Sequence, residues 1–460
     1  MDFIARHRQA ARDFTRRAVF TFERVVGVLL VNLMRSLQVE LDQFFSRISL
    51  PLGRRAHDDA FRMARKKLRW QAFVELNQAV LADLHPAPDW HGLRVVACDG
   101  TTLYLPTTHP DTISSGPDGF NCYHSQGGIY SLARASALCE TSSGLILHAS
   151  LAADTRDERS MLAEQFEHLR PNDLLVLDRG YPAYWLFALL LARQQHFCIR
   201  LPQSFSPQVQ AFVASGQACA VIRMQPGHGQ RQDFVQHQLP MDAFSVRLVR
   251  VPLKTGQIEI LATSLLDASR WPAADFAALY QQRWRIEEAF RHLKCRLQLE
   301  QFGGETPQAI RQEFHASILL HNLAIIAAQD VLAEQELDAA RLAPNLTHAT
   351  HLVRLYLPQL LEDPASIDRI GPALFAGIAG QISKRRPGKP APPRKPNRRK
   401  PRRHRAYKRG YGHAISLFSR QYPTGHPSTE GNKSQTHCGG VRCQWRGITA
   451  KPAAYCRQST

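Results

Sequence analysis

Four polar residues near the middle of the chain have the types and the spacing for chemistry on a phosphate backbone. They lie in the stretch LYQQRWRIEEAFRHLKCRL, residues 279–297, and are Tyr280, Arg283, Glu287 and Lys294. At about 100° and 1.5 Å per residue, a helix places them on one stripe about 60° wide and about 21 Å long. One carboxylate set among two cations and a phenol suits the binding of phosphates and a metal ion.

The same stretch predicts how this helix is held in the fold. Five apolar residues form a second stripe beside the polar one: Leu279, Ile286, Phe290, Leu293 and Leu297. We therefore predict a single amphipathic helix over 279–297, docked on a core through its apolar stripe. Arg285 falls on the far side, away from the polar stripe. The simpler interpretation is a solvent-exposed helix edge on which Arg283 and Glu287 form an i,i+4 ion pair.

The spacing Y-x2-R-x3-E-x6-K, with the local string RWRIEEAF, resembles the signature of the insertion-sequence-four superfamily of DDE transposases. In that family the glutamate of the motif is a metal-binding carboxylate, a role that the resemblance gives to Glu287 and not to Glu288. The family's two other acidic residues match Asp99 in RVVACDGTTLYL and Asp178 at the end of LLVLD. The resemblance covers roughly residues 14–330.

The resemblance implies a ribonuclease H-like sheet that brings the three carboxylates together. Asp99 would lie on its first strand, Asp178 on its fourth, and Glu287 on a later helix packed against them. Three converging carboxylates repel one another unless divalent cations lie between them, and all-oxygen ligation favours Mg²⁺ or Mn²⁺, with two ions expected. Such ions would activate a water and stabilise the leaving oxygen. Both aspartates have a simpler interpretation as turn residues, although a buried strand has little use for a carboxylate that binds nothing.

The function that the resemblance implies is that of an insertion-sequence transposase. It would bind the element's ends, with Tyr280, Arg283 and Lys294 on phosphates, and catalyse metal-dependent DNA cleavage and strand transfer by cut-and-paste transposition. The family also implies a homodimer on double-stranded DNA. The alternative is a catalytically inactive DNA-binding repressor, which would share every basic feature but gain nothing from three acids that repel phosphate. A sugar hydrolase with paired carboxylates would leave the basic charge unexplained.

Whole-chain composition agrees with a nucleic-acid partner. The 460 residues have a formal net charge of +19 and a pI near 9.9, which implies a polyanionic partner. The nine cysteines are scattered and show no disulfide framework, as in proteins of a reducing cytosol. No apolar run reaches the roughly 18 residues that span a bilayer, and the N-terminus has no signal-peptide pattern. We therefore expect a cytoplasmic protein that acts away from membranes.

Hydrophobic periodicity predicts an α/β core, which the resemblance implies is catalytic. Strand patterns lie at 94–105, 128–140 and 145–153, and a strand–helix–strand pattern follows at 173–201. The first three strands are expected to be antiparallel, and the first is expected to end at Asp99-Gly100. The predicted organisation is a helical DNA-binding domain at 1–90, a ribonuclease H-like catalytic domain at 91–201 and 269–335, a β insertion at 202–268, a helical segment at 336–383 and a basic disordered tail at 384–460.

Two regions are strongly basic. Residues 1–70 hold 15 Lys and Arg against 7 Asp and Glu, and their pattern predicts helix, turn and helix, with Asp58 or Asp59 as N-cap of the second helix. That helix would present four exposed cations to DNA: Arg62, Arg65, Lys66 and Lys67. Residues 384–409 hold 14 Lys and Arg and no acid, which predicts a cationic arm that binds phosphates without sequence preference. In both regions the simpler interpretation is charge that keeps a surface or linker hydrated.

Overall fold

The structure is a computed structural model. It describes residues 2–384 except for positions 17, 32–35, 51–55, 85–89, 126–127, 254 and 339–340. The chain divides into two units, Met1–Tyr411 and Gly412–Thr460, and all described residues belong to the first. The predicted basic tail therefore lies outside the described residues, apart from Lys384.

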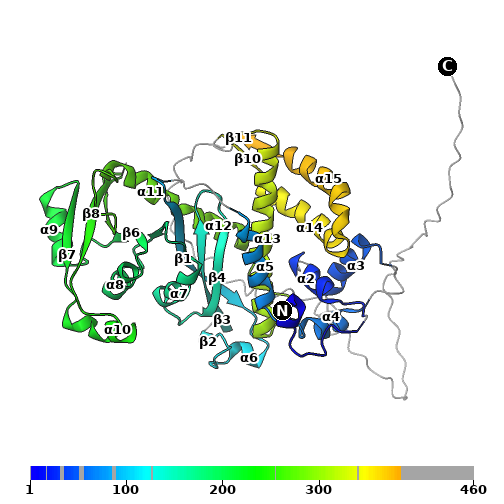
Figure 1. Ribbon diagram of the computed structural model, residues 1–460. Coiled ribbons are helices and arrows are strands. Elements are labelled where there is room, and N and C mark those ends of the chain that lie inside the picture. The colour runs from blue at the N-terminus through cyan, green and yellow to red at the C-terminus, as the bar shows by residue number, and fades with distance from the viewer. Residues whose placement is uncertain are drawn as a thin grey trace, which may run out of the picture. The chain divides into compact units, whose positions relative to one another are not determined.

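A mixed sheet forms the centre of the first unit (Figure 1). Its strands are β1 Arg94–Leu105, β2 Tyr123–Ser125, β3 Gly128–Glu140, β4 Ile146–Ala153, β5 Asp173–Leu177, β6 His196–Leu201, β7 Cys219–Met224, β8 Phe244–Pro252 and β9 Ile258–Thr263. Their order is β2-β3-β1-β5-β6-β9-β8-β7, and β4 pairs with β3. The β1–β5 and β5–β6 pairs are parallel and the others are antiparallel. The predicted α/β class is confirmed, with a large mixed sheet.

The first strands match their predicted ranges, because alternating apolar residues and β-formers mark them clearly. β3 spans the predicted 128–140, and β1, β3 and β4 form the predicted antiparallel set. The expectation that β1 closes on Asp99-Gly100 is wrong. β1 continues to Leu105, and Asp99 is paired with Ala137 in the β1–β3 ladder. Pairing with a long neighbouring strand thus outweighs the local turn preference of Asp-Gly.

The segment predicted as a β insertion contains β7, β8 and β9, together with two helices, α9 Pro207–Ser215 and α10 Arg231–Gln236, that the alternation did not predict. Its strands continue the central sheet, because β9 pairs antiparallel with β6. Val246 and Ile260 of these strands share a core with Leu186 of the helix between β5 and β6. The segment is therefore part of the central sheet, joined to it by backbone pairing and by a common core.

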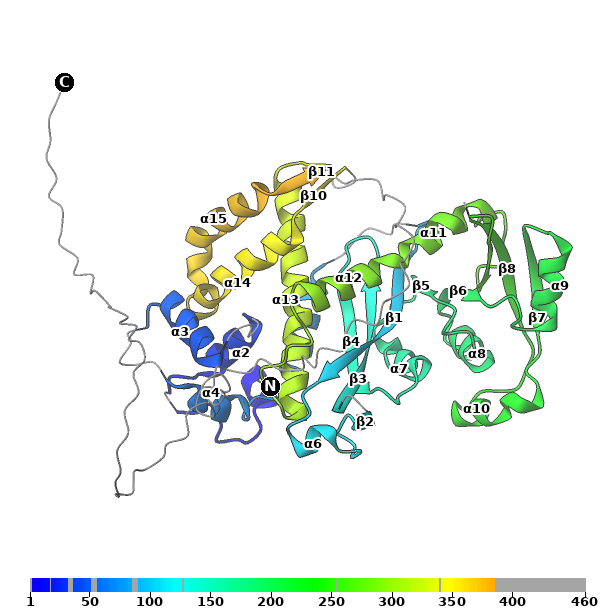
Figure 2. The ribbon, with the colours of Figure 1, turned by 180° about the vertical axis from the view of Figure 1, so that it is seen from behind.

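Helices cover both faces of the sheet. Apart from α9 and α10, the α-helices of the described residues are α1 Phe3–His7, α2 Phe22–Leu30, α3 Leu37–Arg47, α4 Asp58–Arg65, α5 Gln71–Ala82, α6 Pro110–Ile113, α7 Glu158–Glu164, α8 Tyr184–Ala192, α11 Phe276–Gln282, α12 Trp284–Cys295, α13 Pro307–Glu334, α14 Leu346–Glu362 and α15 Ile367–Ala379. α7 and α8 pack on the face to which Cys98 and Leu175 point. α11 and α12 run across the opposite face (Figure 2), where Ala97 and Leu103 meet Ile286. The short strands β10 Leu342–Pro344 and β11 Ile382–Lys384 pair with each other.

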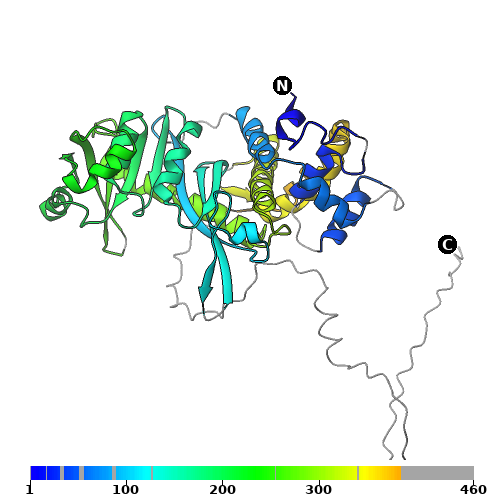
Figure 3. The ribbon, with the colours of Figure 1, turned by 90° about the horizontal axis from the view of Figure 1, so that it is seen from below.

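The long helix α13 belongs to two cores at once. Ile310, Phe314 and Ile318 pack with the sheet and α12, whereas Ala316 and Leu319 pack with the helices before residue 85. Viewed from below, α2, α3 and α4 lie on the opposite side of α13 from the strands (Figure 3). α5 instead contacts both α13 and β4, and Asn77 on it donates to the carbonyl of Ile146 at 3.2 Å. α13 is also long and apolar enough to cross a membrane, but 72% of its most apolar window is buried inside the protein. Such burial is typical of a core helix.

The N-terminal helices differ in detail from the prediction. The helix predicted to run on from Asp58 is two helices, α4 and α5, separated by residues 66–70. The N-cap of α4 is His57, and Asp58 is already the first helical residue, so the predicted cap is wrong by one position. The predicted break at Pro51–Gly53 lies outside the described residues.

Candidate active site

Asp99 lies on β1, and Asp178 is the first residue after β5, the strand that pairs in parallel with β1. Ala97 of β1 is in register with Val176 of β5, and each aspartate follows two residues later. Adjacent strands are about 4.8 Å apart, so this pairing brings Asp178 near Asp99. Because side chains alternate between faces, Asp99 shares the face of Ala97, which packs in the same core as Ile286 of α12.

Glu287 lies on α12 and is linked to Asp99 through Arg283. The Nη2 of Arg283 donates to Oε1 of Glu287 at 2.8 Å, and its Nη1 lies 3.5 Å from Oδ2 of Asp99. The side chain of Arg283 is 9% exposed and that of Asp99 is 20% exposed. The guanidinium therefore sits between two of the three predicted acidic residues, in a place with little access for water.

The electrostatics of Asp99 link all three carboxylates. Its pKa is raised to about 6, chiefly by burial, and this rise is opposed by the N–H of Gly100, which donates to Oδ1 at 2.8 Å. The negative charges of Asp178 and Glu287 also raise the pKa, while Arg283 lowers it. The three acids thus share one electrostatic neighbourhood, in which each added negative charge is unfavourable.

The helix that carries Glu287 is interrupted at Arg283, so the prediction of a single helix over 279–297 is wrong. α11 ends at Gln282 and α12 begins at Trp284. The N–H of Arg283 bonds to the carbonyl of Tyr280, three residues back as in a 3₁₀ turn. Tyr280 is 6% exposed and packs in the core under α11. It does not stand on an open polar stripe: its ring is buried, and the guanidinium of Arg283 lies 5.9 Å from the ring centroid.

The other residues of the motif helix lie as the phasing predicts. The Nζ of Lys294 donates to the carbonyl of Thr102 on β1 at 2.6 Å. Burial lowers the pKa of Lys294, and the charge of Glu300 opposes this change. Arg285 pairs instead with Glu288 at 3.2 Å on the exposed side of α12. The predicted apolar stripe is buried throughout: Leu279, Ile286, Phe290, Leu293 and Leu297.

The donor chemistry of the trio fits a divalent cation. All three side chains are carboxylates, the ligands that Mg²⁺ and Mn²⁺ prefer, and two of them already bind the cationic guanidinium of Arg283. In the described part of the chain, no three acidic, histidine or cysteine side chains are grouped closely enough to hold a metal ion as they stand. The three acids are therefore of the right chemical type for a metal site, and the guanidinium of Arg283 lies between Asp99 and Glu287.

Glu158, which no sequence pattern singles out, lies against Gly100 of β1. A Cβ at Gly100 would come within 2.6 Å of the Glu158 carboxylate, so a larger residue beside Asp99 would displace this side chain. Glu158 is the first residue of α7 and pairs with Arg134 of β3 at 3.3 Å. An acidic residue in a first helical turn is an ordinary helix-start signal, so the sequence alone offers no way to find this contact.

Three of the four predicted N-terminal cations are exposed, as expected: Arg62, Lys66 and Lys67. Arg62 and Lys66, with Arg69, line one side of a cleft of about 960 Å³. Residues from 109–119 and 303–312 provide much of the remaining lining, together with Gln9, Leu37, Arg65, Trp70 and Gln71. The basic side of this cleft suits contact with phosphates.

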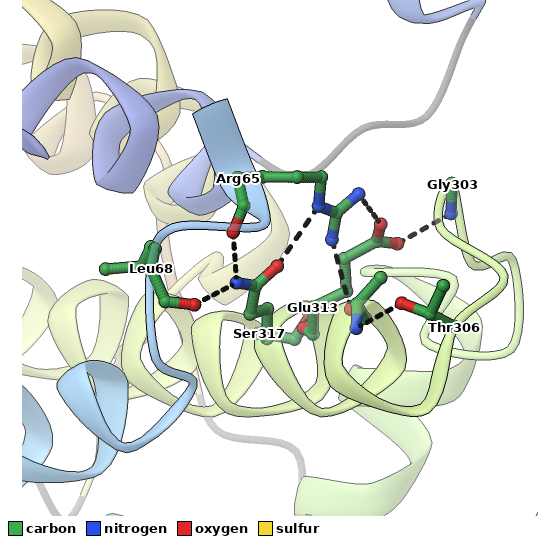
Figure 4. Close-up of polar contacts among 8 residues, drawn as sticks. Arg65, Leu68, Gly303, Thr306, Glu313 and Ser317 are labelled. Atoms are coloured by element: carbon green, nitrogen blue, oxygen red, sulfur yellow. Dashed lines mark hydrogen bonds and ion pairs between the residues drawn. The ribbon is translucent and has the colours of Figure 1, made fainter. Parts of the chain in front are cut away.

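The prediction that Arg65 is exposed is wrong. Its guanidinium donates to Gln312, to Glu313 at 3.0 Å and to the carbonyl of Ala309, all on α13 (Figure 4). Gln312 in turn donates to the carbonyls of Arg65 and Leu68. These bonds fasten the turn between α4 and α5 to α13. Arg65 therefore serves to position the basic turn, and its charge is not available to DNA.

Replacement of Arg65 by alanine is expected to lower the free energy of unfolding by about 3 to 5 kcal/mol, because Glu313 would be left buried without its partner. Urea unfolding followed by circular dichroism measures this loss. Arg62→Ala, on the same helix but exposed, is the matched control and should change the value by less than about 0.5 kcal/mol. Equal effects of the two substitutions would show that the Arg65–Glu313 pair does not stabilise the fold.

Two buried histidines join α12 to the helices behind it. The Nδ1 atoms of His292 on α12 and His321 on α13 lie 3.0 Å apart. His292 also contacts Thr350 of α14 at 3.3 Å, and His321 contacts the carbonyl of Gly144 at 3.3 Å. Burial lowers the pKa of His292 to about 4 and that of His321 to about 3. Both rings are therefore neutral near pH 7 and hold the Glu287 helix on α13 and α14.

These two histidines should make the free energy of unfolding depend on pH. An unfolded chain binds their protons near pH 6.5, but the folded chain does so only near pH 4 or below. The free energy of unfolding is therefore expected to fall as the pH decreases from about 6.5 to about 4, by up to about 1.4 kcal/mol per pH unit for each ring. Urea unfolding across this range should show a shallower slope for His321→Gln, whereas exposed His124→Gln should keep the slope. An unchanged slope in His321→Gln would contradict the assignment.

Comparison with known proteins gives a family match, relatives among curated proteins and similar solved structures. The family model described as Transposase DDE domain matches residues 90–323. Transposase InsG for insertion sequence element IS4, from Escherichia coli, is 24% identical over 242 residues, which are 52% of this chain and 53% of that protein. Putative transposase y4zB of Sinorhizobium fredii is 37% identical over 84 residues, 18% of this chain and 23% of that protein. The chain thus spans about half, or less, of the length of these relatives. The piggyBac transposase synaptic complex with hairpin DNA has a TM-score of 0.43 at 12% identity, over 82% of this chain and 81% of that one.

Proposed function

Because this chain belongs to the family of the transposase DDE domain, whose model matches residues 90–323 of its 460, we propose that it is an insertion-sequence transposase. It binds the ends of its element and performs metal-dependent cleavage and strand transfer by cut-and-paste transposition. The family membership confirms the resemblance carried by the Y-x2-R-x3-E-x6-K motif. That this chain itself cleaves DNA, recognises the ends of its element and joins them to a target is our proposal.

One observation carries the proposal. The parallel pairing of β1 with β5 brings the end of β5, directly before Asp178, beside the part of β1 that carries Asp99, and the charges of Asp178 and Glu287 both raise the pKa of Asp99. Arg283 bridges Asp99 and Glu287. Residues separated by 79 and 109 positions in sequence thereby contribute to one acidic site. A DNA-binding protein without catalysis would gain nothing from gathering three charges that repel phosphate.

In the proposed mechanism, Asp99, Asp178 and Glu287 would hold divalent cations such as Mg²⁺ or Mn²⁺. When bound, such cations generate a nucleophile from water and stabilise the leaving oxygen. The chain's own task is to position the DNA, because phosphoryl transfer depends mainly on alignment and charge stabilisation. Hydrolysis frees a 3′-hydroxyl at the element end, and this hydroxyl then attacks the target strand.

The cations of the motif bind the phosphates that flank the scissile bond. Lys294 is held beside β1 by the carbonyl of Thr102, and Arg283 already lies among the acids. Tyr280 supports Arg283 from the core, with the guanidinium 5.9 Å from its ring centroid. Farther away, Arg62, Lys66 and Lys67 contact the duplex, while Arg65 holds their turn in place. We also propose a homodimer on paired ends, as the family resemblance implies.

The proposal is tested with a duplex that carries the DNA flanking the coding sequence. The purified full chain is incubated with this duplex in Mg²⁺ and, separately, in EDTA, and the strands are resolved on a denaturing gel. Cleavage at discrete positions near the element ends, dependent on Mg²⁺, is the expected result. Specific binding without cleavage would instead support the repressor.

A further inference from the structure

Both terminal nitrogens of Arg283 are directed at carboxylates. Nη2 donates to Glu287 at 2.8 Å and Nη1 lies 3.5 Å from Asp99. The remaining donor, Nε, is buried and has no hydrogen-bond partner among the described residues. In this position the guanidinium presents no exposed pair of donors to a phosphate. The proposed function nevertheless needs a cation at the scissile strand, so Arg283 must change partners to serve there.

A divalent cation and Arg283 compete for the same oxygens. A metal held by Asp99 and Glu287 would compete with the guanidinium, which is now directed at Oδ2 of Asp99 and Oε1 of Glu287. With Asp178, the ionised trio has a charge of −3, which Arg283 reduces to −2. The guanidinium therefore stabilises the acids as long as no metal is bound, and it weakens the attraction of a metal to them.

The surroundings of Arg283 leave it a short route to the surface. It is the single residue between α11 and α12, so its backbone is held by 3₁₀-type bonds and not by a continuous helix. Its guanidinium lies 5.3 Å from the ring centroid of Trp284, which is 50% exposed. Rotation of the arginine side chain past this ring would bring its donors to the side of the site that is open to solvent.

We propose that Arg283 is a counter-ion that exchanges partners, neutralising Asp99 and Glu287 in the metal-free protein and moving to a DNA phosphate when a divalent cation takes their oxygens. This inference rests on the proposed function, and it adds that metal binding and DNA binding depend on each other. The metal releases the arginine that binds DNA, and DNA draws the arginine away from the oxygens that bind metal. Metal binding and DNA binding should therefore strengthen each other by the same factor, because linkage is reciprocal.

The first test measures Mn²⁺ binding to the full chain without DNA, by electron paramagnetic resonance of the free ion. Arg283→Ala should bind Mn²⁺ about 10- to 100-fold more tightly than the unchanged protein, as expected when one or two charge-assisted hydrogen bonds no longer compete. Arg283→Gln, which keeps the size without the charge, should also bind more tightly. Arg285→Ala, which removes the same charge from the exposed side of α12, should leave the affinity unchanged.

The second test measures the coupling directly. The probe is a duplex that ends at the mapped cleavage position, so that no strand needs to be cut, and its affinity is measured with and without Mn²⁺. Mn²⁺ should raise the DNA affinity of the unchanged protein by about 5-fold or more, and this gain should disappear in Arg283→Ala and Arg283→Gln. Thermal unfolding in EDTA verifies that each variant is folded.

The outcomes separate this inference from the function on which it rests. Equal or weaker Mn²⁺ binding by both folded Arg283 variants, or a coupling that survives in them, would overturn the exchange of partners while the metal site stands. Absence of Mn²⁺ binding in the unchanged protein and in every variant would overturn the proposed metal site and this inference together. Metal affinity raised equally by Arg285→Ala would show a general charge effect and would also overturn the exchange.

Discussion

Asp99→Asn, Asp178→Asn and Glu287→Gln are each expected to reduce DNA cleavage by more than about 1000-fold while DNA binding survives. An amide of equal size lacks the charge that holds a divalent cation, and losing that cation removes several kcal/mol of charge stabilisation from the transition state. Gel electrophoresis of labelled element ends measures cleavage, and a mobility shift of the same DNA measures binding.

The matched control for this series is Glu288→Gln, next to Glu287 but paired with Arg285 on the exposed side of α12. It should retain nearly full cleavage, because its carboxylate is remote from Asp99. Full activity of any one of the three acid variants would remove that residue from the site. Loss of DNA binding in all three folded variants would show that the acids maintain the DNA-binding surface and do not catalyse cleavage.

Arg283→Ala and Lys294→Ala are expected to reduce cleavage by about 10- to 1000-fold, as removal of a cation that stabilises a charged transition state implies. Arg285→Ala should cost much less, because this residue lies on the other side of α12. Both functional cations also have structural contacts, Arg283 with two acids and Lys294 with the carbonyl of Thr102. Thermal unfolding must therefore be measured for every variant. Equal losses for all three, in folded proteins, would contradict the assignment of Arg283 and Lys294 to the DNA.

Much of the sheet and the acidic site could be predicted from the sequence. The strand around Asp99 and the strand before Asp178 carry dense β-formers, and the motif around Glu287 has a long, specific spacing. The turn preference of Asp-Gly wrongly predicts that the first strand ends at Asp99-Gly100. Pairing with β3, which begins at residue 128 and so is distant in sequence, keeps these two residues within β1. The parallel pairing of β1 with β5, which brings Asp178 near Asp99, joins segments nearly 80 positions apart and cannot be predicted from either segment alone.

Other features escaped prediction because they are tertiary. Arg65 has the local setting of an exposed cation, and only the approach of α13 supplies the carboxylate that buries it. The interruption at Arg283 leaves no proline or glycine in the sequence to announce it, so helical phasing was extended across it to Tyr280. The contact of Glu158 with Gly100 joins α7 to β1 and has no local signal either.

The double membership of α13 in two cores limits how this protein can be dissected. Removing the first 85 residues would uncover Ala316 and Leu319, which now pack against the N-terminal helices. It would also leave Glu313 without Arg65. A fragment without these residues should therefore expose a hydrophobic strip and tend to aggregate. Loss of transposition in such a fragment could then be due to poor solubility alone and would not demonstrate a loss of DNA recognition. Point substitutions, not truncations, are the way to separate recognition from chemistry in this chain.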